Sequence, residues 1–310
     1  MIRYISFYTT IFDIHFIPEN DVSLSDNVKN IEIGERQLHY VDQGGEGRQT
    51  PAIIFIHGGL DDYRCWQYQM DSFSKKYRTI SFSRRFAYPN KWIGNVAQDN
   101  TIEDNAKDLA ELIRKLDLAP AHLVGASYGV FTALYCASKN PELAKTMVLN
   151  EPPIMEFLAR SHLKEDVELR QTFRTRVLSP TQDASRAGDF RKAAQVAIDG
   201  IMGIDNYFGQ LPEEGKQFLI DNAKSLESEL ESAMLTSFTT EDVKQVTTIP
   251  TLLVKGELSP KYFLRIVDIL FENMPNNTEQ IVIPNVSHDD FKSGDFFTSK
   301  VIQFFERQNR

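Results

Sequence analysis

One serine in this sequence stands where its hydroxyl group could act as a nucleophile. Ser127 is the centre of a G-x-S-x-G pattern over residues 125–129. The apolar residues 122–124 enter this pattern, and a helical stretch leaves it. A sharp turn from a strand into a helix exposes the serine hydroxyl and places it beside the positive end of the helix. The pattern therefore predicts a reactive serine on such a turn.

Alternating strands and helices must position this serine. Residues 31–34 and 37–42 read as a hairpin, and further strands are predicted at 52–56, 78–82, 122–124, 145–150, 250–254 and 280–283. Helical patterns cover residues 65–75, 101–116, 127–138, 262–274 and 295–307. Thr101 can cap the second of these helices, with acidic residues in its first turn. Strand–helix alternation of this kind is typical of the α/β class, with a doubly wound, mainly parallel sheet.

The alternation stops after residues 151–153, which read Glu-Pro-Pro. From there to about residue 248 the patterns are helical, and no convincing strand is found. A helical block with sheet elements on both sides is typical of an inserted lid. We therefore expect an N-terminal arm (1–29), an α/β core (30–151 and 249–310) and a helical lid (152–248).

Composition narrows the partners that we expect. The net charge of −9 disfavours nucleic acid and anionic membranes as partners. No apolar run approaches the ~18 residues of a membrane span, and the charges of Arg3 and Asp13 in the apolar start disfavour a signal peptide. Two cysteines, Cys65 and Cys136, favour a reducing, cytoplasmic location. We expect a small-molecule substrate, a monomer or homodimer, and no cofactor or metal, because nucleotide-binding and metal-ligand patterns are not found.

From about Asn30 onward the chain resembles the α/β-hydrolase superfamily, through its G-x-S-x-G pattern and through the sequence His-Gly-Gly at residues 57–59. In that family the loop after this strand and the residue after the nucleophile each supply a backbone N–H to an oxyanion. The resemblance implies Gly59 and Tyr128 as these donors, with Leu60 as an alternative to Gly59. One such donor typically contributes about 3–4 kcal/mol to transition-state stabilisation. We expect His57 itself to be structural.

The family order of catalytic groups is nucleophile, acid, histidine. Only His162 and His288 follow Ser127 in the chain. His162 lies in a charged segment of the expected lid and reads as a surface residue. His288 follows a strand and a short loop, which is where the family places its base, so the resemblance implies that His288 activates Ser127.

The acid is not where most family members have it. Their loop reads roughly G-E-x-D-P, whereas residues 256–260 read G-E-L-S-P, and Ser259 cannot carry a charge. Glu257 is two residues early, and its usual role in this loop is structural. Asp289 and Asp290 adjoin the histidine, which makes a good hydrogen bond to its ring awkward. Glu151 follows the strand that ends at residue 150, as in a subgroup of haloalkane dehalogenases, and we predict that it is the acid; the other reading is a hinge residue.

Dehalogenases and epoxide hydrolases of this fold use an aspartate nucleophile, so Ser127 favours acyl transfer. We expect a carboxylesterase-like serine hydrolase that cleaves an ester-type bond of a small, apolar substrate. The alternatives are a ligand-binding protein with slow or no turnover, a cofactor-free haloperoxidase and a C–C bond hydrolase.

Two further features could shape the pocket. Arg84 and Arg85 could bind an acidic substrate group, or they could form salt bridges to the lid or core. Apolar residues of the expected lid could line the pocket, or they could only anchor the lid helices to the core; these are Ile154, Met155, Phe157, Met202, Tyr207, Phe208 and Phe238.

Overall fold

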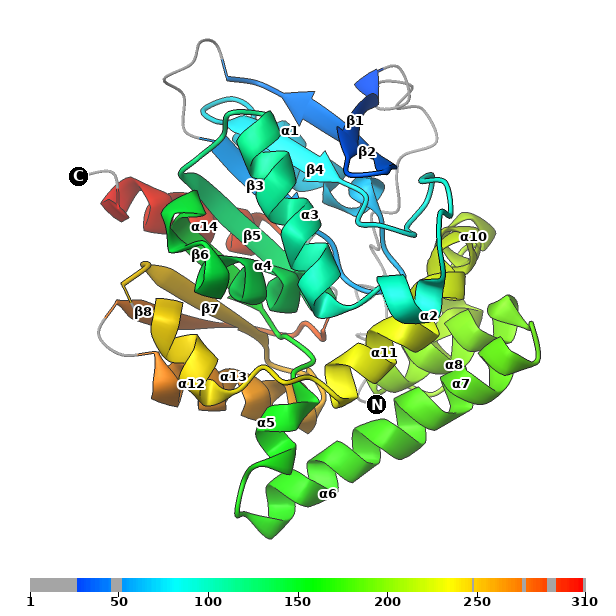
Figure 1. The fold of residues 1–310 in the computed structure, drawn as a ribbon. Helices are drawn as coiled ribbons and strands as arrows, with labels where there is room; N and C mark the ends of the chain where they lie inside the picture. The colour runs from blue at the N-terminus through cyan, green and yellow to red at the C-terminus, as the bar shows by residue number, and fades with distance from the viewer. Residues whose placement is uncertain (1–26, 46–51, 247, 275–276, 289–293, 309–310) are drawn as a thin grey trace, which may run out of the picture.

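A twisted sheet of eight strands runs through the described part of the chain (Figure 1). The computed structural model describes residues 27–45, 52–246, 248–274, 277–288 and 294–308, so the expected N-terminal arm lies almost entirely outside it. The strand order is β1-β2-β4-β3-β5-β6-β7-β8. The β1–β2 and β2–β4 pairs are antiparallel and the others are parallel. The predicted mainly parallel sheet is thereby confirmed.

The strands agree closely with the apolar runs. They are β1 Lys29–Ile33, β2 Arg36–Gln43, β3 Ala52–Ile56, β4 Arg78–Phe82, β5 Ala121–Ala126, β6 Ala144–Asn150, β7 Thr251–Gly256 and β8 Thr278–Ile283. Every residue of β3 and β5 is buried, because helices cover both faces of a parallel sheet. The main difference from prediction is that β7 continues to Gly256, which pairs in register with Ile283.

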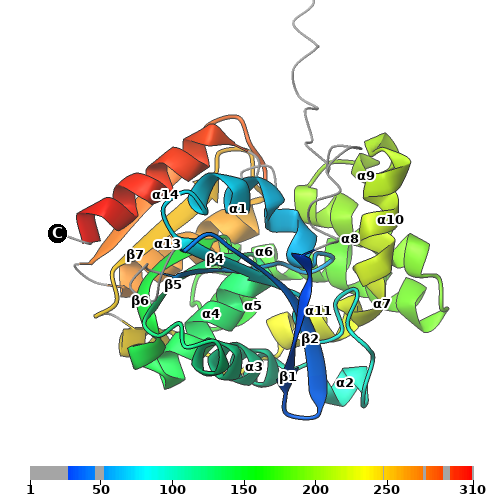
Figure 2. The ribbon, with the colours of Figure 1, turned by 90° about the horizontal axis from the view of Figure 1, so that it is seen from above.

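Two apolar clusters divide the core between the two faces of the sheet. In β3, Ile54 and Ile56 face one cluster while Ile53 and Phe55 face the other, as the period of two in a strand requires. The first face carries α3 Ile102–Lys115, α4 Tyr128–Lys139 and α13 Lys261–Asn273. The second carries α1 Gln67–Phe73 and α14 Asp295–Gln308 (Figure 2). The doubly wound arrangement is confirmed.

The start of α3 shows how the sequence sets an element boundary. The Thr101 side chain accepts a hydrogen bond from the Asp104 N–H at the predicted cap. The predicted helix over 65–75 begins differently, as a 3₁₀ turn over Tyr63–Trp66 that passes into α1.

Between β6 and β7 the chain forms helices, and no strand occurs among its described residues. We call residues 155–246 the helical block; Figure 1 shows α6 to α11 gathered on one side of the core, whereas α12 lies beside α13. Its helices are α5 Met155–Ala159, α6 Lys164–Phe173, α7 Ser179–Arg186, α8 Phe190–Met202, α9 Tyr207–Gln210, α10 Glu213–Asn222, α11 Leu226–Met234 and α12 Thr240–Val243, with a π-helical turn at Arg174–Leu178.

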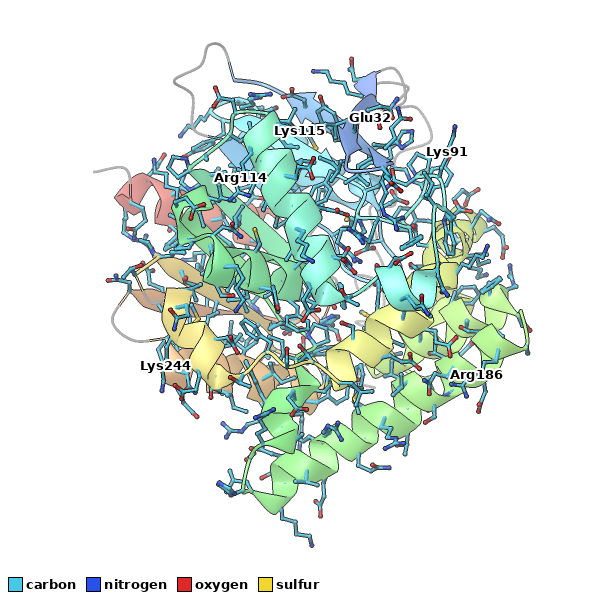
Figure 3. All side chains as sticks on the ribbon, viewed as in Figure 1. Glu32, Lys91, Arg114, Lys115, Arg186 and Lys244 are labelled. Atoms are coloured by element: carbon cyan, nitrogen blue, oxygen red, sulfur yellow. The ribbon has the colours of Figure 1, made fainter. Side chains whose placement is uncertain are left out.

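Charged side chains mostly lie on the outside of the molecule. Those labelled in Figure 3 are all exposed: Glu32, Lys91, Arg114, Lys115, Arg186 and Lys244. A few charged residues are instead buried, and two of them, Asp61 and Glu229, line the cavity that contains Ser127.

Candidate active site

Ser127 occupies the turn between β5 and α4 in a backbone conformation that few residues other than glycine adopt. Its φ is 50° and its ψ is −119°, and its N–H donates to the carbonyl oxygen of Asn150 at 2.9 Å. The flanking glycines make this turn possible. A Cβ atom on Gly125 would lie 2.9 Å from the backbone of Gly129, and one on Gly129 would collide with the carbonyl oxygen of Ile56. The spacing of the motif is therefore a packing requirement.

Glu151 and His288 form a buried hydrogen-bonded pair. Glu151 directly follows β6, with φ of 49°, and its side chain is fully buried. One carboxylate oxygen lies 2.7 Å from His288 Nδ1, and the other accepts the Gly256 N–H at 2.7 Å. A carboxylate on Nδ1 favours the tautomer that leaves Nε2 free to accept a proton. Nε2 is buried and has no hydrogen-bond partner among the described residues.

An aromatic ring fixes the plane of this imidazole. Phe263, on α13, stacks on His288 with 3.8 Å between ring centroids and 11° between the planes. Phe173 of the helical block packs edge-on against Phe263. The histidine is thus held from one side by a carboxylate and from one face by a ring.

Glu257, the other described carboxylate considered for the acid, makes a different contact. Glu257 is exposed and accepts the Asn285 N–H at 2.9 Å, which is a loop contact. Ser259 is buried, and its hydroxyl has no hydrogen-bond partner among the described residues. Asp289 and Asp290 lie outside the described residues. Among the described candidates, the carboxylate hydrogen-bonded to the histidine is that of Glu151.

Ser127 and His288 both line one small cavity, together with Gly59 and Tyr128. Leu60 is not part of its lining; it is buried, with φ of 62°. His57 is also buried: its Nδ1 lies 2.8 Å from the Gly58 carbonyl oxygen, and its Nε2 accepts the Arg84 N–H at 2.9 Å. His57 therefore holds the loop after β3, which agrees with its predicted structural role.

The cavity has a volume of about 30 Å³, room for a water molecule or two. Apolar side chains from the helical block and the core make up most of its wall: Pro153, Phe173, Ile198, Ile201, Leu226, Leu230, Ala233 and Phe263. Two carboxylate residues, Asp61 and Glu229, complete the lining. The sequence did not single out these residues, because a helical pattern shows which face is buried but not what covers it.

The apolar residues proposed as possible pocket walls do not line this cavity. All seven are buried in the larger apolar cluster: Ile154, Met155, Phe157, Met202, Tyr207, Phe208 and Phe238. Phe238, for example, packs on the rings of Phe131 and Phe157. The interpretation as pocket walls is wrong for this cavity, and the anchoring interpretation is correct, because these side chains join the block to the core.

Both arginines of the loop after β4 form internal ion pairs, so the salt-bridge interpretation is confirmed. Arg85 binds Asp108 of α3, with 2.7 Å and 2.6 Å hydrogen bonds. Arg84 binds both carboxylate oxygens of Glu229, on α11, at 3.1 Å.

Burial raises the pKa of Tyr128, and the Glu229 carboxylate adds to the effect, so the Tyr128 phenol stays protonated near neutral pH.

The described residues contain neither a metal-binding cluster nor a membrane-spanning helix. No three histidine, cysteine, aspartate or glutamate residues of the described ranges are grouped as a metal ion would require. Among the described helices, none combines the length and apolar character needed to cross a membrane.

Comparison with known proteins agrees with this architecture. The chain is 25% identical over 258 residues to epoxide hydrolase 3 of Xenopus tropicalis, covering 81% of this chain and 70% of the relative. It is 22% identical over 193 residues to the uncharacterized hydrolase YraK of Bacillus subtilis, covering 61% and 68%. The enol-lactonase of Burkholderia xenovorans superposes with a TM-score of 0.73 at 17% identity, over 90% of this chain and all of the other. Residues 51–295 match the alpha/beta hydrolase fold family, and the chain belongs to that family.

Proposed function

We propose that this protein is a serine hydrolase that cleaves an ester-type bond of a small, apolar substrate through an acyl-enzyme. The observation that carries the proposal is the buried hydrogen bond between Glu151 and His288. His288 lines the same cavity as Ser127. A serine hydroxyl is a poor nucleophile unless a base takes its proton. In the proposed reaction, Nε2 of His288 takes the proton of Ser127 and later gives it to the leaving group.

Glu151 has two roles in this proposal. It fixes the imidazole tautomer, and its negative charge stabilises the imidazolium that forms when Ser127 attacks. The 2.7 Å bond from the Gly256 N–H occupies its second oxygen and holds the carboxylate in place. The proposed oxyanion donors are the backbone N–H groups of Gly59 and Tyr128, since both residues line the cavity beside Ser127.

The lining supports an apolar, uncharged substrate. Its wall is mainly aliphatic and aromatic, and the two arginines near it are occupied by internal carboxylates. Among the described residues, the lining includes the carboxylate residue Asp61 and no lysine or arginine, which disfavours a negatively charged substrate group. A cavity of about 30 Å³ is too small for an ester, so we propose that the helical block acts as a lid that moves to admit one.

Two of the relatives bear on the reaction class. Epoxide hydrolases of this fold use an aspartate nucleophile, whereas the turn after β5 in this chain holds Ser127. A lactone is an internal ester, so the activity named for the Burkholderia protein falls within the class proposed here. Residue chemistry at the turn therefore favours ester cleavage over epoxide opening.

Active-site labelling tests the proposal. We expect the wild-type protein to react with a fluorophosphonate probe and to hydrolyse p-nitrophenyl butyrate. Ser127→Ala should abolish labelling and lower kcat by more than about 10⁴-fold. A p-nitrophenyl ester with a carboxylate on its acyl chain should be a poorer substrate than the uncharged ester. A wild-type protein that neither labels nor turns over any short ester would overturn the proposal and favour a ligand-binding role.

A further inference from the structure

Arg84 is a buried arginine that lies behind the loop of the proposed oxyanion hole. Only 2% of its side chain is exposed. Its Nε donates to the His57 carbonyl oxygen at 3.1 Å, and its Nη2 donates to the Gly58 carbonyl oxygen at 2.9 Å. Nη1 lies 3.3 Å from the side-chain oxygen of Asn105. One guanidinium group thus grips two successive carbonyl groups of the loop after β3.

The Gly58 carbonyl is held from two directions. Because the Arg84 N–H donates to His57 Nε2, the neutral ring carries its proton on Nδ1 and donates it to the Gly58 oxygen, 2.8 Å away. In a planar trans peptide the N–H of the next residue points opposite to this carbonyl. Fixing the Gly58 oxygen therefore fixes the direction of the Gly59 N–H, which is one of the two proposed oxyanion donors.

The same guanidinium reaches the second donor residue and the helical block. Its Cζ lies 4.7 Å from the centre of the Tyr128 ring. Its Nη2 donates to both carboxylate oxygens of Glu229. This carboxylate adjoins Gly59, because a Cβ atom on Gly59 would lie 3.1 Å from Glu229 Oε2. An unpaired carboxylate so close to an oxyanion would oppose its formation, and Arg84 neutralises it.

We propose that Arg84 is a positioning residue for the oxyanion hole, and that Glu229 couples this positioning to closure of the helical block. The inference rests on the proposed function. While α11 is in place, Glu229 holds Arg84 against the loop after β3. When the block moves away to admit substrate, Arg84 loses this partner, so the oxyanion hole is complete only in the closed protein.

The neighbouring ion pair provides a matched control. Arg85 and Asp108 are also buried, with side-chain exposures of 8% and 7% against 2% and 4% for Arg84 and Glu229, and their hydrogen bonds of 2.7 Å and 2.6 Å are shorter. Neither residue lines the cavity, and their pair lies between the loop after β4 and α3. A residue that only supports the fold should behave like Arg85, whereas a positioning residue should affect the chemical step as well.

The experiment compares single and paired replacements on a p-nitrophenyl ester. Arg84→Met should lower kcat by about 10²-fold, the loss typical of a misplaced or missing oxyanion donor, while KM changes by less than about threefold. Affinity for an alkyl boronic acid, which forms a tetrahedral adduct with the serine, should fall in parallel. Glu229→Gln, which keeps one acceptor for Arg84, should lower kcat by about tenfold.

The paired variant separates positioning from folding. Arg84→Met/Glu229→Leu leaves no buried unpaired charge, so its Tm should recover relative to Arg84→Met while its kcat stays low. Arg85→Met/Asp108→Leu should keep the wild-type kcat. Recovery of kcat in the first pair would overturn the positioning role, and an unchanged kcat in Glu229→Gln would overturn the coupling. If the wild-type protein does not label with fluorophosphonate, the proposed function fails and this inference fails with it; if it labels and the Arg84 variants are fully active, only the inference fails.

Discussion

The chain after β6 and the end of β7 both contribute to the carboxylate contact of His288. Most of this family places that carboxylate in the loop after the penultimate strand. After β6, Glu151 presents a buried carboxylate to His288. At the end of β7, the Gly256 N–H donates to Glu151, and in the loop beyond it Ser259 stands at the expected carboxylate position. In the proposed triad, the end of β7 therefore supports an acid that follows β6.

The arrangement of the two strands explains how a carboxylate after β6 can reach the histidine. β6 and β7 are adjacent and parallel, so their carboxyl ends lie at the same edge of the sheet. Glutamate adds one methylene group to the reach of an aspartate. A carboxylate after β6 can therefore contact His288, while a backbone N–H at the end of β7 bonds its other oxygen.

The largest loss of kcat is expected when Glu151, directly after β6, is replaced. Glu151→Gln keeps the shape of the side chain but removes the charge and allows the wrong histidine tautomer. We expect kcat to fall by about 10³- to 10⁴-fold with the fold retained. The measurement is steady-state hydrolysis of p-nitrophenyl butyrate beside a thermal melt. Near-normal activity in this variant would show that the acid has been assigned to the wrong loop.

A smaller loss of kcat is expected when Gly256, whose N–H bonds Glu151, is replaced. In Gly256→Ala the new Cβ atom would lie 2.7 Å from both the Val286 carbonyl oxygen and the Ser259 hydroxyl, so the loop that leads to His288 must shift. We expect kcat to fall by about 10- to 100-fold. Ser259→Ala is the control, because that hydroxyl makes no hydrogen bond among the described residues, and its kcat should stay within about threefold of the wild type. If the control is the more damaging change, the β7 loop contributes more than a backbone donor.

The smallest effect is expected at Glu257. Its carboxylate is exposed and accepts one backbone N–H, a contact that the amide oxygen of Gln can also make. Glu257→Gln should therefore change kcat by less than about twofold and leave the Tm close to the wild type. A loss as large as that of Glu151→Gln would reverse the comparison of the two loops.

The fold was largely predictable because its signals are local. Continuous apolar runs indicate strands buried on both faces, and Thr101 with its acidic neighbours marks a helix start that the structure has at the same residue. The β7 boundary was placed two residues short, since Lys255 and Gly256 are not apolar and their strand pairing comes from β8. Tertiary pairing, which a local pattern does not contain, extends the strand.

The site was predictable only in part. Motif spacing predicts Ser127, chain order predicts His288, and the place of Glu151 after a strand predicts the acid, because these features are carried by the sequence. Glu229 was missed, since nothing in an acidic helical segment distinguishes a carboxylate that faces a buried arginine from one that faces water. For the same reason the helical block's aromatic residues could be recognised as buried, but the residues that line the cavity could not be chosen.

The backbone at the two ends of this site has a consequence for how the protein can change. Ser127 and Glu151 both adopt left-handed φ values, 50° and 49°, which cost residues other than glycine about 1–3 kcal/mol each. They directly follow the adjacent strands β5 and β6, and the Ser127 N–H donates to the carbonyl oxygen of Asn150. Backbone preference alone would favour glycine at both positions, whereas the proposed reaction needs their side chains. Selection for stability and selection for activity therefore act in opposite directions at these two residues, and their retention together would identify active relatives.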